Sequence, residues 1–315
     1  MKRDVIDAIG DTPLVAISAF SPRPAVRLFA KLEGSNPSGS VKDRIAKHMV
    51  REAERNGVLR AGTTIVEATS GNTGISLAMV GRVRGYGVKA VMPANVSAGR
   101  VRLLEAYGAE IVLTDAAQGV NGSIIVARRL ADETPGHYMP DQHGNPANPR
   151  AHYETTAPEI IRDLPDIDAF VAGLGTGGTL MGVGQALREH NPDVRIVAAA
   201  PHPDGVIEGL RAIEHGYVPP VLDLSRLDDR VIVDVDEALS WTRRLMSEAG
   251  IFAGVSSGAV VAAAAKVAAR LDRGNVVCLL ADGGWKYLST GLWTAPAPDP
   301  NRRAGPGRRT ESGGR

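Results

Sequence analysis

The chain has 315 residues, of which 43% are hydrophobic and 23% are charged, and its formal net charge at pH 7 is +1. These values are typical of a globular protein that is long enough to bury a substantial core. The near-zero net charge and the aromatic fraction of 4% argue against a nucleic-acid partner, which requires a basic surplus or stacking surfaces.

The cysteine content and the apolar runs exclude further classes of protein. The single cysteine, Cys278, rules out a disulfide framework or a structural zinc site within one chain, and we expect no metal. The N-terminal segment MKRDVIDAIG lacks the apolar stretch of a signal peptide, and the longest apolar runs are too short and too charged to span a bilayer. We therefore expect a cytoplasmic protein with no membrane partner.

Apolar, β-branched runs alternate with helical patterns along the chain. The predicted strands are 63–69, 89–94, 110–116, 169–175 and 195–201, and the helical patterns that follow the first four are 74–85, 100–108, 123–134 and 180–191. This alternation predicts an α/β fold with parallel sheets covered by helices on both faces. A dense run of Pro, Asn and Gly at 138–150 marks a domain boundary, with a second α/β unit from about Ala151.

Lys42 lies in NPSGSVKDR, just after a Ser/Gly turn and in the predicted first turn of a helix. Taken alone, it is most simply a solvent-facing lysine, because a cation is unfavourable beside a helix N-terminus. If it is instead partly desolvated there, its pKa is depressed, as a lysine that forms a Schiff base requires. Both interpretations stay open from this segment alone.

The segment GLGTGGT, residues 173–179, follows a predicted strand and opens a helix, so its backbone amides can bind a phosphate. It satisfies the dinucleotide pattern G-x-G-x-x-G, but the next strand lacks the acidic residue that a ribose requires. A lone phosphate therefore suits the loop better than a dinucleotide. A purely structural turn is the alternative.

A phosphate loop together with a candidate Schiff-base lysine suggests pyridoxal 5'-phosphate (PLP) as the cofactor. The loop EATSGNTG, residues 67–74, then supplies hydroxyls and amides for a substrate carboxylate, and its Asn72 can bond the ring oxygen. In AGVSSGAV, residues 253–260, Ser256 can meet the ring nitrogen. Each loop alone could be a helix N-cap, but four such loops in one chain make coincidence a poor explanation.

The segments NPSGSVKDR, EATSGNTG, DQHGNPANP, GLGTGGTLMG, GIFAGVSSGA and WKYLSTG closely resemble the cysteine synthase family of PLP enzymes, from about Gly10 to Trp293. The resemblance implies a homodimer of fold type II subunits, each with two doubly wound α/β domains of the tryptophan synthase β-like architecture. It places a smaller mobile domain at 1–12 and 36–150 and a larger one at 13–35 and 151–295. The tail at 296–315, rich in Pro, Gly and Arg, should be disordered.

The resemblance also assigns the site residues. It implies that Lys42 binds the cofactor covalently and acts as the catalytic base, that Asn72 contacts the ring oxygen, and that Ser256 faces the ring nitrogen. The residues assigned to the phosphate are Gly175, Thr176, Gly177, Gly178 and Thr179. The residues assigned to the substrate carboxylate are Thr69, Ser70, Thr73 and Gln142.

These parts predict β-replacement on an activated L-serine, in which a leaving group departs from Cβ and a nucleophile takes its place. The predicted product is L-cysteine, with sulfide, thiosulfate or the thiocarboxylate of a small sulfur-carrier protein as sulfur donor. One alternative is a related β-replacement with a nitrogen nucleophile or homocysteine. Another is a cofactor-free binding module, against which the presence of Lys42, Asn72 and the glycine loop counts.

Arg211, in EGLRAIEHGYVP at 208–219, bears on the leaving group. Members of the family that use O-acetylserine carry small, uncharged residues in this segment, and an arginine resembles the branch that uses O-phosphoserine. A guanidinium suits a leaving phosphate, whereas acetate needs no cation. O-phosphoserine is therefore the predicted substrate and O-acetylserine the alternative, and the simplest structural interpretation is a solvent-facing arginine.

Overall fold

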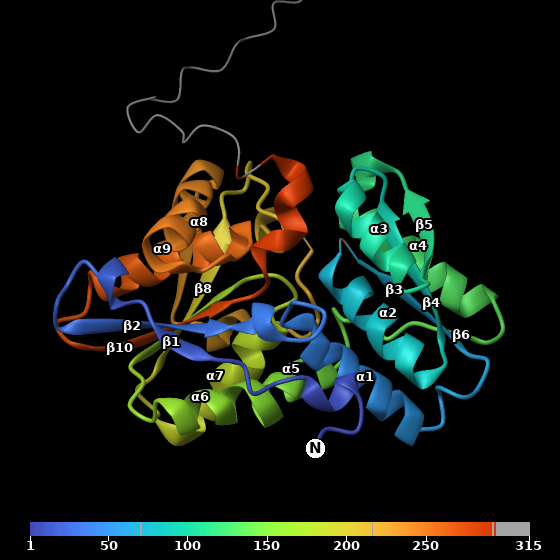
Figure 1. Cartoon of the computed structure of the whole chain (residues 1–315), viewed down its shortest axis with the longest axis horizontal. Coiled ribbons are helices and arrows are strands. Elements are labelled where there is room, and N and C mark those ends of the chain that lie inside the picture. Colours follow the sequence, from blue (N-terminus) through green and yellow to red (C-terminus); the bar gives the residue numbers. More distant parts are fainter. Residues whose placement is uncertain (70, 216, 292, 294–315) are drawn as a thin grey trace, which may run out of the picture.

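The computed structural model describes residues 1–69, 71–215, 217–291 and 293. Two sheets, each with its own covering helices, lie side by side (Figure 1). The larger sheet has six strands in the order β1-β2-β10-β7-β8-β9. All neighbours are parallel except β1, which pairs antiparallel with β2. The strands are β1 (Leu14–Ala16), β2 (Val26–Leu32), β7 (Ala169–Gly173), β8 (Arg195–Pro201), β9 (Asp229–Val233) and β10 (Gly274–Leu280).

Successive side chains of β7 point to opposite faces of this sheet and enter different cores. Val171 belongs to the core beneath α8 (Val235–Ala249) and α9 (Val255–Ala268). Phe170 and Ala172 belong to the core beneath α6 (Ala157–Asp163) and α7 (Gly178–His190). Both faces are thus covered, which explains why the strands are apolar at almost every position. Cys278 is a fully buried residue of β10.

The smaller sheet has four parallel strands in the order β5-β4-β3-β6. They are β3 (Thr64–Ala68), β4 (Gly87–Pro93), β5 (Glu110–Thr114) and β6 (His137–Tyr138). One face packs on α1 (Lys42–Arg55), α2 (Asn72–Arg84) and α3 (Ala98–Ala106), and the other packs on α4 (Gly119–Glu133). A short helix, α5 (Ala147–Ala151), leads through the π-helical turn His152–Thr156 into α6.

The predicted α/β fold class is confirmed. The predicted strands correspond to β3, β4, β5, β7 and β8, and the predicted helices to α2, α3, α4 and α7. The strands of the smaller sheet fall within 36–150 and those of the larger sheet within 13–35 and 151–295. The domain boundaries themselves stay a prediction, and the predicted disordered tail at 296–315 lies outside the described residues. In the described part of the chain, no helix is both long and apolar enough to cross a membrane.

Candidate active site

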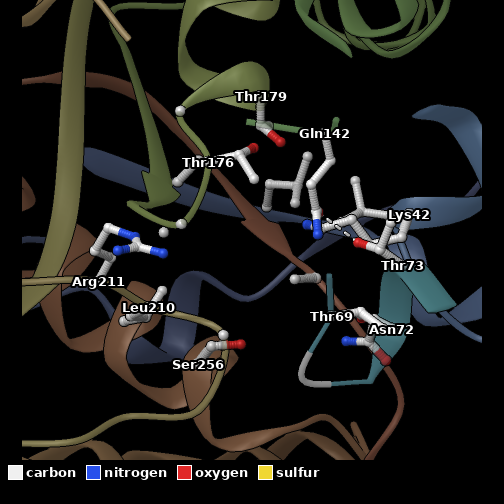
Figure 2. A pocket seen from close by; sticks show the side chains of 18 of the residues that line it. Lys42, Thr69, Asn72, Thr73, Gln142, Thr176, Thr179, Leu210, Arg211 and Ser256 are labelled. Carbon is white, nitrogen blue, oxygen red and sulfur yellow. Dashed lines mark hydrogen bonds between the residues drawn. The ribbon is translucent and has the colours of Figure 1, made fainter. Parts of the chain in front are cut away.

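A cavity is lined by residues that follow the carboxyl ends of strands in both sheets, where ligands of open α/β sheets bind (Figure 2). Nearly all the predicted site residues line it. They are Lys42, Thr69, Asn72, Thr73, Gln142, Gly175, Thr176, Gly177, Thr179, Arg211 and Ser256. Gly178 lies in the same loop as its neighbours and begins α7, and Ser70 lies outside the described residues.

The loop from Gly175 to Thr179 joins β7 to α7 and requires glycine for steric reasons. Gly177 has a φ of +88°, a left-handed conformation that favours glycine. A side chain at Gly175 would place its Cβ 2.8 Å from the carbonyl oxygen of Gly209, and one at Gly178 would collide with the side chain of Asn148. The first turn of a helix has backbone N–H groups without intrahelical partners, so this close-packed start of α7 suits a phosphate.

Two side chains that the sequence did not single out hold this loop. Nδ2 of Asn148 donates to the Thr176 hydroxyl at 3.0 Å. Nε2 of His152 lies 3.3 Å from the Thr179 hydroxyl. Burial, followed by the charge of Arg44, keeps the pKa of His152 well below its usual value, so the imidazole is neutral. Both threonines of the loop are therefore oriented by buried, uncharged groups.

Lys42 is the first residue of α1, as predicted, and lines the cavity. The helix start is attached to the end of β10, because the N–H of Val41 donates to the carbonyl of Ala281 at 2.8 Å. Burial lowers the pKa of the Lys42 amine, opposed by the charges of Asp282 and Glu33. Among the described residues, Lys42 takes part in no ion pair of the kind that Lys31, Lys89 and Lys266 form. The amine therefore has the depressed pKa that a Schiff-base lysine requires.

Buried charges anchor the helix that carries Lys42. Asp43 accepts a hydrogen bond from the hydroxyl of Ser76 at 2.6 Å, which ties α1 to α2. Arg44 pairs with Glu33 and with Glu159, each at 2.7 Å. Removing one partner of such a pair would leave an uncompensated buried charge, so these contacts fix the helix firmly.

The loop between β3 and α2 is held by Thr69. Its hydroxyl accepts hydrogen bonds from the backbone N–H groups of Gly71 at 3.0 Å and Gly74 at 3.1 Å. The N-cap residue of α2 is Gly71, which has no side chain to cap the helix, and Thr69 instead binds the N–H of Gly74 in the first turn. The same loop also lines the cavity, so capping and ligand binding are compatible.

Gln142 lies beside this loop in the wall of the cavity and bonds to it directly. The Thr73 hydroxyl donates to Oε1 of Gln142 at 2.6 Å, and Nε2 of Gln142 donates to the carbonyl of Ala68 at 2.9 Å. Beneath them Glu67 is fully buried, and its Oε2 accepts the backbone N–H of Gln142 at 3.3 Å. Burial, followed by the charge of Asp141, raises the pKa of Glu67 to about 8, so its carboxyl is protonated at neutral pH.

Asn72 begins α2, and its amide is held on both sides. Nδ2 donates to Oδ2 of Asp282 at 2.7 Å, and Oδ1 accepts from Nζ of Lys286 at 2.7 Å. The hydroxyl of Tyr287 donates to the same oxygen of Asp282 at 2.9 Å. Ser256, in the first turn of α9, lies across the cavity from Asn72 (Figure 2).

Arg211 lies on the wall opposite Lys42 (Figure 2). Its guanidinium carbon is 4.7 Å from the centroid of the Tyr217 ring, and Nη1 donates to Oδ1 of Asn121 at 3.1 Å. Burial lowers its pKa, and only Tyr217 opposes this, so no described carboxylate neutralises the guanidinium. Arg211 is therefore half-buried and lines the cavity, and its role as a ligand stays a prediction.

His143, adjacent to Gln142, belongs to the same wall and was not predicted. Its ring meets the Tyr217 ring edge to face, with centroids 5.8 Å apart. In the described structure neither ring nitrogen has a hydrogen-bond partner. Burial, followed by the charge of Arg211, lowers its pKa to about 4, so the imidazole is neutral. The segment DQHGNPANP is one of those that resemble the cysteine synthase family, but nothing in it pointed to His143 as a residue of the site.

The cavity fits PLP. The glycine loop leaves no room for side chains where a phosphate would approach the backbone. An amine of lowered pKa, a fixed amide and a neutral hydroxyl line the remaining walls, at Lys42, Asn72 and Ser256. These are the types of group that an imine, a ring oxygen and a ring nitrogen require.

The chain is similar to known PLP enzymes. The family model described as "Pyridoxal-phosphate dependent enzyme" matches residues 5–282. The chain is 46% identical over 300 residues to a probable cysteine synthase of Bacillus subtilis, an alignment that covers 91% of this chain and 96% of the relative. It is 43% identical over 290 residues to cysteine synthase B of Pseudomonas aeruginosa, with 92% and 97% covered.

Solved structures agree. An O-ureido-L-serine synthase superposes with a TM-score of 0.89 at 42% identity and covers 96% of this chain and 98% of its own. An O-acetylserine dependent cystathionine beta-synthase from Helicobacter pylori superposes with a TM-score of 0.87 at 35% identity, with 93% and 99% covered. The predicted cofactor and enzyme class are confirmed, whereas the roles of single site residues stay predictions. The chain belongs to the pyridoxal-phosphate dependent enzymes and, within them, to the cysteine synthase family.

Proposed function

We propose that this enzyme makes L-cysteine by β-replacement on an activated L-serine. The observation that carries the proposal is the convergence of three features on one cavity. The amine of Lys42, the glycine loop before α7 and the hydrogen-bonding loop before α2 all line it. The similarity to cysteine synthases of two bacteria supports the same reaction.

PLP, when bound, supplies a carbon that condenses with the substrate amine and a ring that absorbs negative charge. The glycine loop would hold its phosphate, and Asn72 and Ser256 would bond its ring. The neutral hydroxyl of Ser256 would supply no negative charge to stabilise a protonated ring nitrogen, and an unprotonated ring would favour β-elimination over transamination. The residues proposed for the substrate carboxylate are Thr69, Ser70, Thr73 and Gln142.

Lys42 moves the proton. Its free amine takes the proton from Cα of the serine derivative, the Cβ–O bond breaks, and the leaving group departs with the electron pair. A sulfur nucleophile then forms a bond with Cβ, and Lys42 returns the proton to Cα. The lowered pKa of Lys42 suits this role, because more of the amine is neutral at working pH.

The proposed leaving group is phosphate, and Arg211 is its proposed ligand. The guanidinium faces the cavity opposite Lys42 and is neutralised by no described carboxylate. A phosphate carries about two negative charges at neutral pH and gains from such a cation, whereas acetate gains little. O-acetylserine is the alternative substrate.

Steady-state kinetics with sulfide test this assignment. The wild type should prefer O-phosphoserine. Loss of a charge-assisted hydrogen bond costs about 1.5–3 kcal/mol, so Arg211→Ala should lose roughly 10- to 150-fold in kcat/KM for O-phosphoserine alone. Arg162→Ala, at an exposed arginine of α6 paired with Asp163, is the control and should change kcat/KM for neither substrate. A wild type that prefers O-acetylserine, or an equal loss for both substrates, would contradict the role of Arg211.

The nucleophile is open to a direct test. Sulfide, thiosulfate and a sulfur-carrier thiocarboxylate are the proposed donors, and mass spectrometry of the product distinguishes cysteine from other β-substituted alanines. The likeness to an O-ureido-L-serine synthase and to a cystathionine beta-synthase keeps a nitrogen nucleophile or homocysteine as the second candidate. Sulfide would give cysteine and thiosulfate would give S-sulfocysteine, both of which carry sulfur without a homocysteine carbon chain at Cβ. A main product that carries nitrogen or homocysteine at Cβ would favour the second candidate.

We also propose a cytoplasmic homodimer in which residues 1–12 and 36–150 move as the smaller domain. The division of the strands between the two sheets supports this boundary. Light scattering of the purified enzyme tests the dimer, and a monomeric mass would refute it.

A further inference from the structure

Lys286 is a second buried lysine beside the cavity. It lies in the 3-10 turn Gly284–Thr290 that follows β10, and its side chain is held above the Trp285 ring, with Nζ 5.3 Å from the ring centroid. Nζ donates to Oδ1 of Asn72 at 2.7 Å, a contact between residues 214 positions apart. The mechanism above uses neither Lys286 nor this turn.

The opposite side of the same amide is held by an acid. Nδ2 of Asn72 donates to Oδ2 of Asp282 at 2.7 Å, and Tyr287 donates to the same oxygen at 2.9 Å. Turning the amide over would put its N–H groups against an ammonium and its oxygen against a carboxylate. Only one orientation of Asn72 is therefore compatible with both neighbours.

We propose that Lys286 and Asp282 are positioning residues that lock the Asn72 amide for the cofactor. This rests on the proposed contact between Asn72 and the ring oxygen of PLP. In the locked orientation the amide oxygen and one amide hydrogen are already bonded, so one hydrogen remains to donate. An ammonium on the amide oxygen also polarises the group and strengthens that remaining donor.

The charge that this lock requires is present at neutral pH. Burial lowers the pKa of Lys286 to about 8, opposed by the charges of Asp282 and Asp43. The amine therefore stays mostly protonated near pH 7. A donor fixed before the ligand arrives loses no freedom when it binds, so the lock should raise the affinity for PLP.

Titration of the apoenzyme with PLP tests the proposal without turnover. Lys286→Met keeps the aliphatic stem and should weaken PLP binding roughly tenfold, the effect of one hydrogen bond to a charged group. It should also shift the visible absorption band of the bound cofactor, and Lys286→Arg should restore much of both. Lys266→Met is the control, because Lys266 of α9 also has a 2.7 Å contact, an ion pair with Glu237, but lies away from Asn72 and the cavity lining. That variant should leave affinity and spectrum unchanged.

A double-mutant cycle separates positioning from a general loss of structure. If Lys286 acts through Asn72, then Asn72→Ala weakens PLP binding and Lys286→Met adds nothing in that background. Should Asn72→Ala leave the affinity unchanged, the Asn72 assignment under the proposed function fails and the lock fails with it. Should Asn72→Ala weaken binding while Lys286→Met has no effect, or should the two effects add, the lock alone is overturned. Circular dichroism of each variant confirms that it is folded.

Discussion

Glu67 should make the stability of this enzyme depend on pH in a defined direction. The residue is fully buried on β3, and only one of its two oxygens has a hydrogen-bond partner in the described structure. Burial raises its pKa from 4.5 to about 8. Between these values the folded protein keeps a proton that the unfolded chain has released. The free energy of unfolding should therefore fall as pH rises through this window and level off above about pH 8.

The magnitude follows from the shift. One pKa unit corresponds to about 1.4 kcal/mol, so raising the pKa from 4.5 to about 8 lowers the free energy of unfolding above pH 8 by no more than about 5 kcal/mol. Glu67→Gln has nearly the same volume and cannot ionise. Relative to the wild type, the variant should gain stability steadily from about pH 5 to about pH 8, and the gain should then stay constant.

Urea denaturation at about pH 5, 7 and 9, at a fixed saturating PLP concentration, measures this difference. Glu110→Gln is the matched control, since Glu110 belongs to the same sheet but its side chain is 60% exposed. That variant should follow the wild-type pH profile. Parallel profiles for wild type and Glu67→Gln would show that Glu67 is ionised in the folded enzyme and would refute the reasoning.

Two further predictions concern the proposed chemistry. Lys42→Ala should abolish turnover with either serine derivative, because the variant lacks both the covalent partner of PLP and the base. Its circular dichroism spectrum should stay unchanged. If the variant turns over and keeps the wild-type visible spectrum, another lysine is the covalent partner and the base. Ser256→Asp should retain PLP but release phosphate from O-phosphoserine more slowly when no nucleophile is present, because a carboxylate would accept a hydrogen bond from a protonated ring nitrogen and stabilise that form. An unchanged release rate would remove Ser256 from that position.

The sequence predicted the parts of the site whose signals are local. A strand, a glycine-rich turn and a helix follow one another at 169–190, and Lys42 comes directly after a Ser/Gly turn. No local signal in the sequence indicates Lys286, because its partner Asn72 is 214 positions away. Asn72 follows a strand of the smaller sheet and Lys286 a strand of the larger sheet, so only the packing of the two sheets' units against each other brings them together. The strands β1, β2, β6 and β9 were also not predicted, and for β1 and β6 the reason is their length. With three and two residues, they are too short to show an alternating pattern.

The loop before α2 is both a turn and a ligand site, because of how its hydrogen bonds are shared. The Thr69 oxygen accepts two backbone N–H groups, so the hydroxyl keeps only its hydrogen for a ligand. Gln142 accepts from Thr73 and gives one amide hydrogen to Ala68, which leaves one more. Asn72 has likewise one free hydrogen after its bonds to the chain. At Thr69, Gln142 and Asn72 these contacts thus leave one donor each, whereas Thr73 has given its hydrogen to Gln142 and keeps only acceptors. A carboxylate or a ring oxygen only accepts, whereas water or a neutral amide also needs to donate, so the three remaining donors favour anionic ligands.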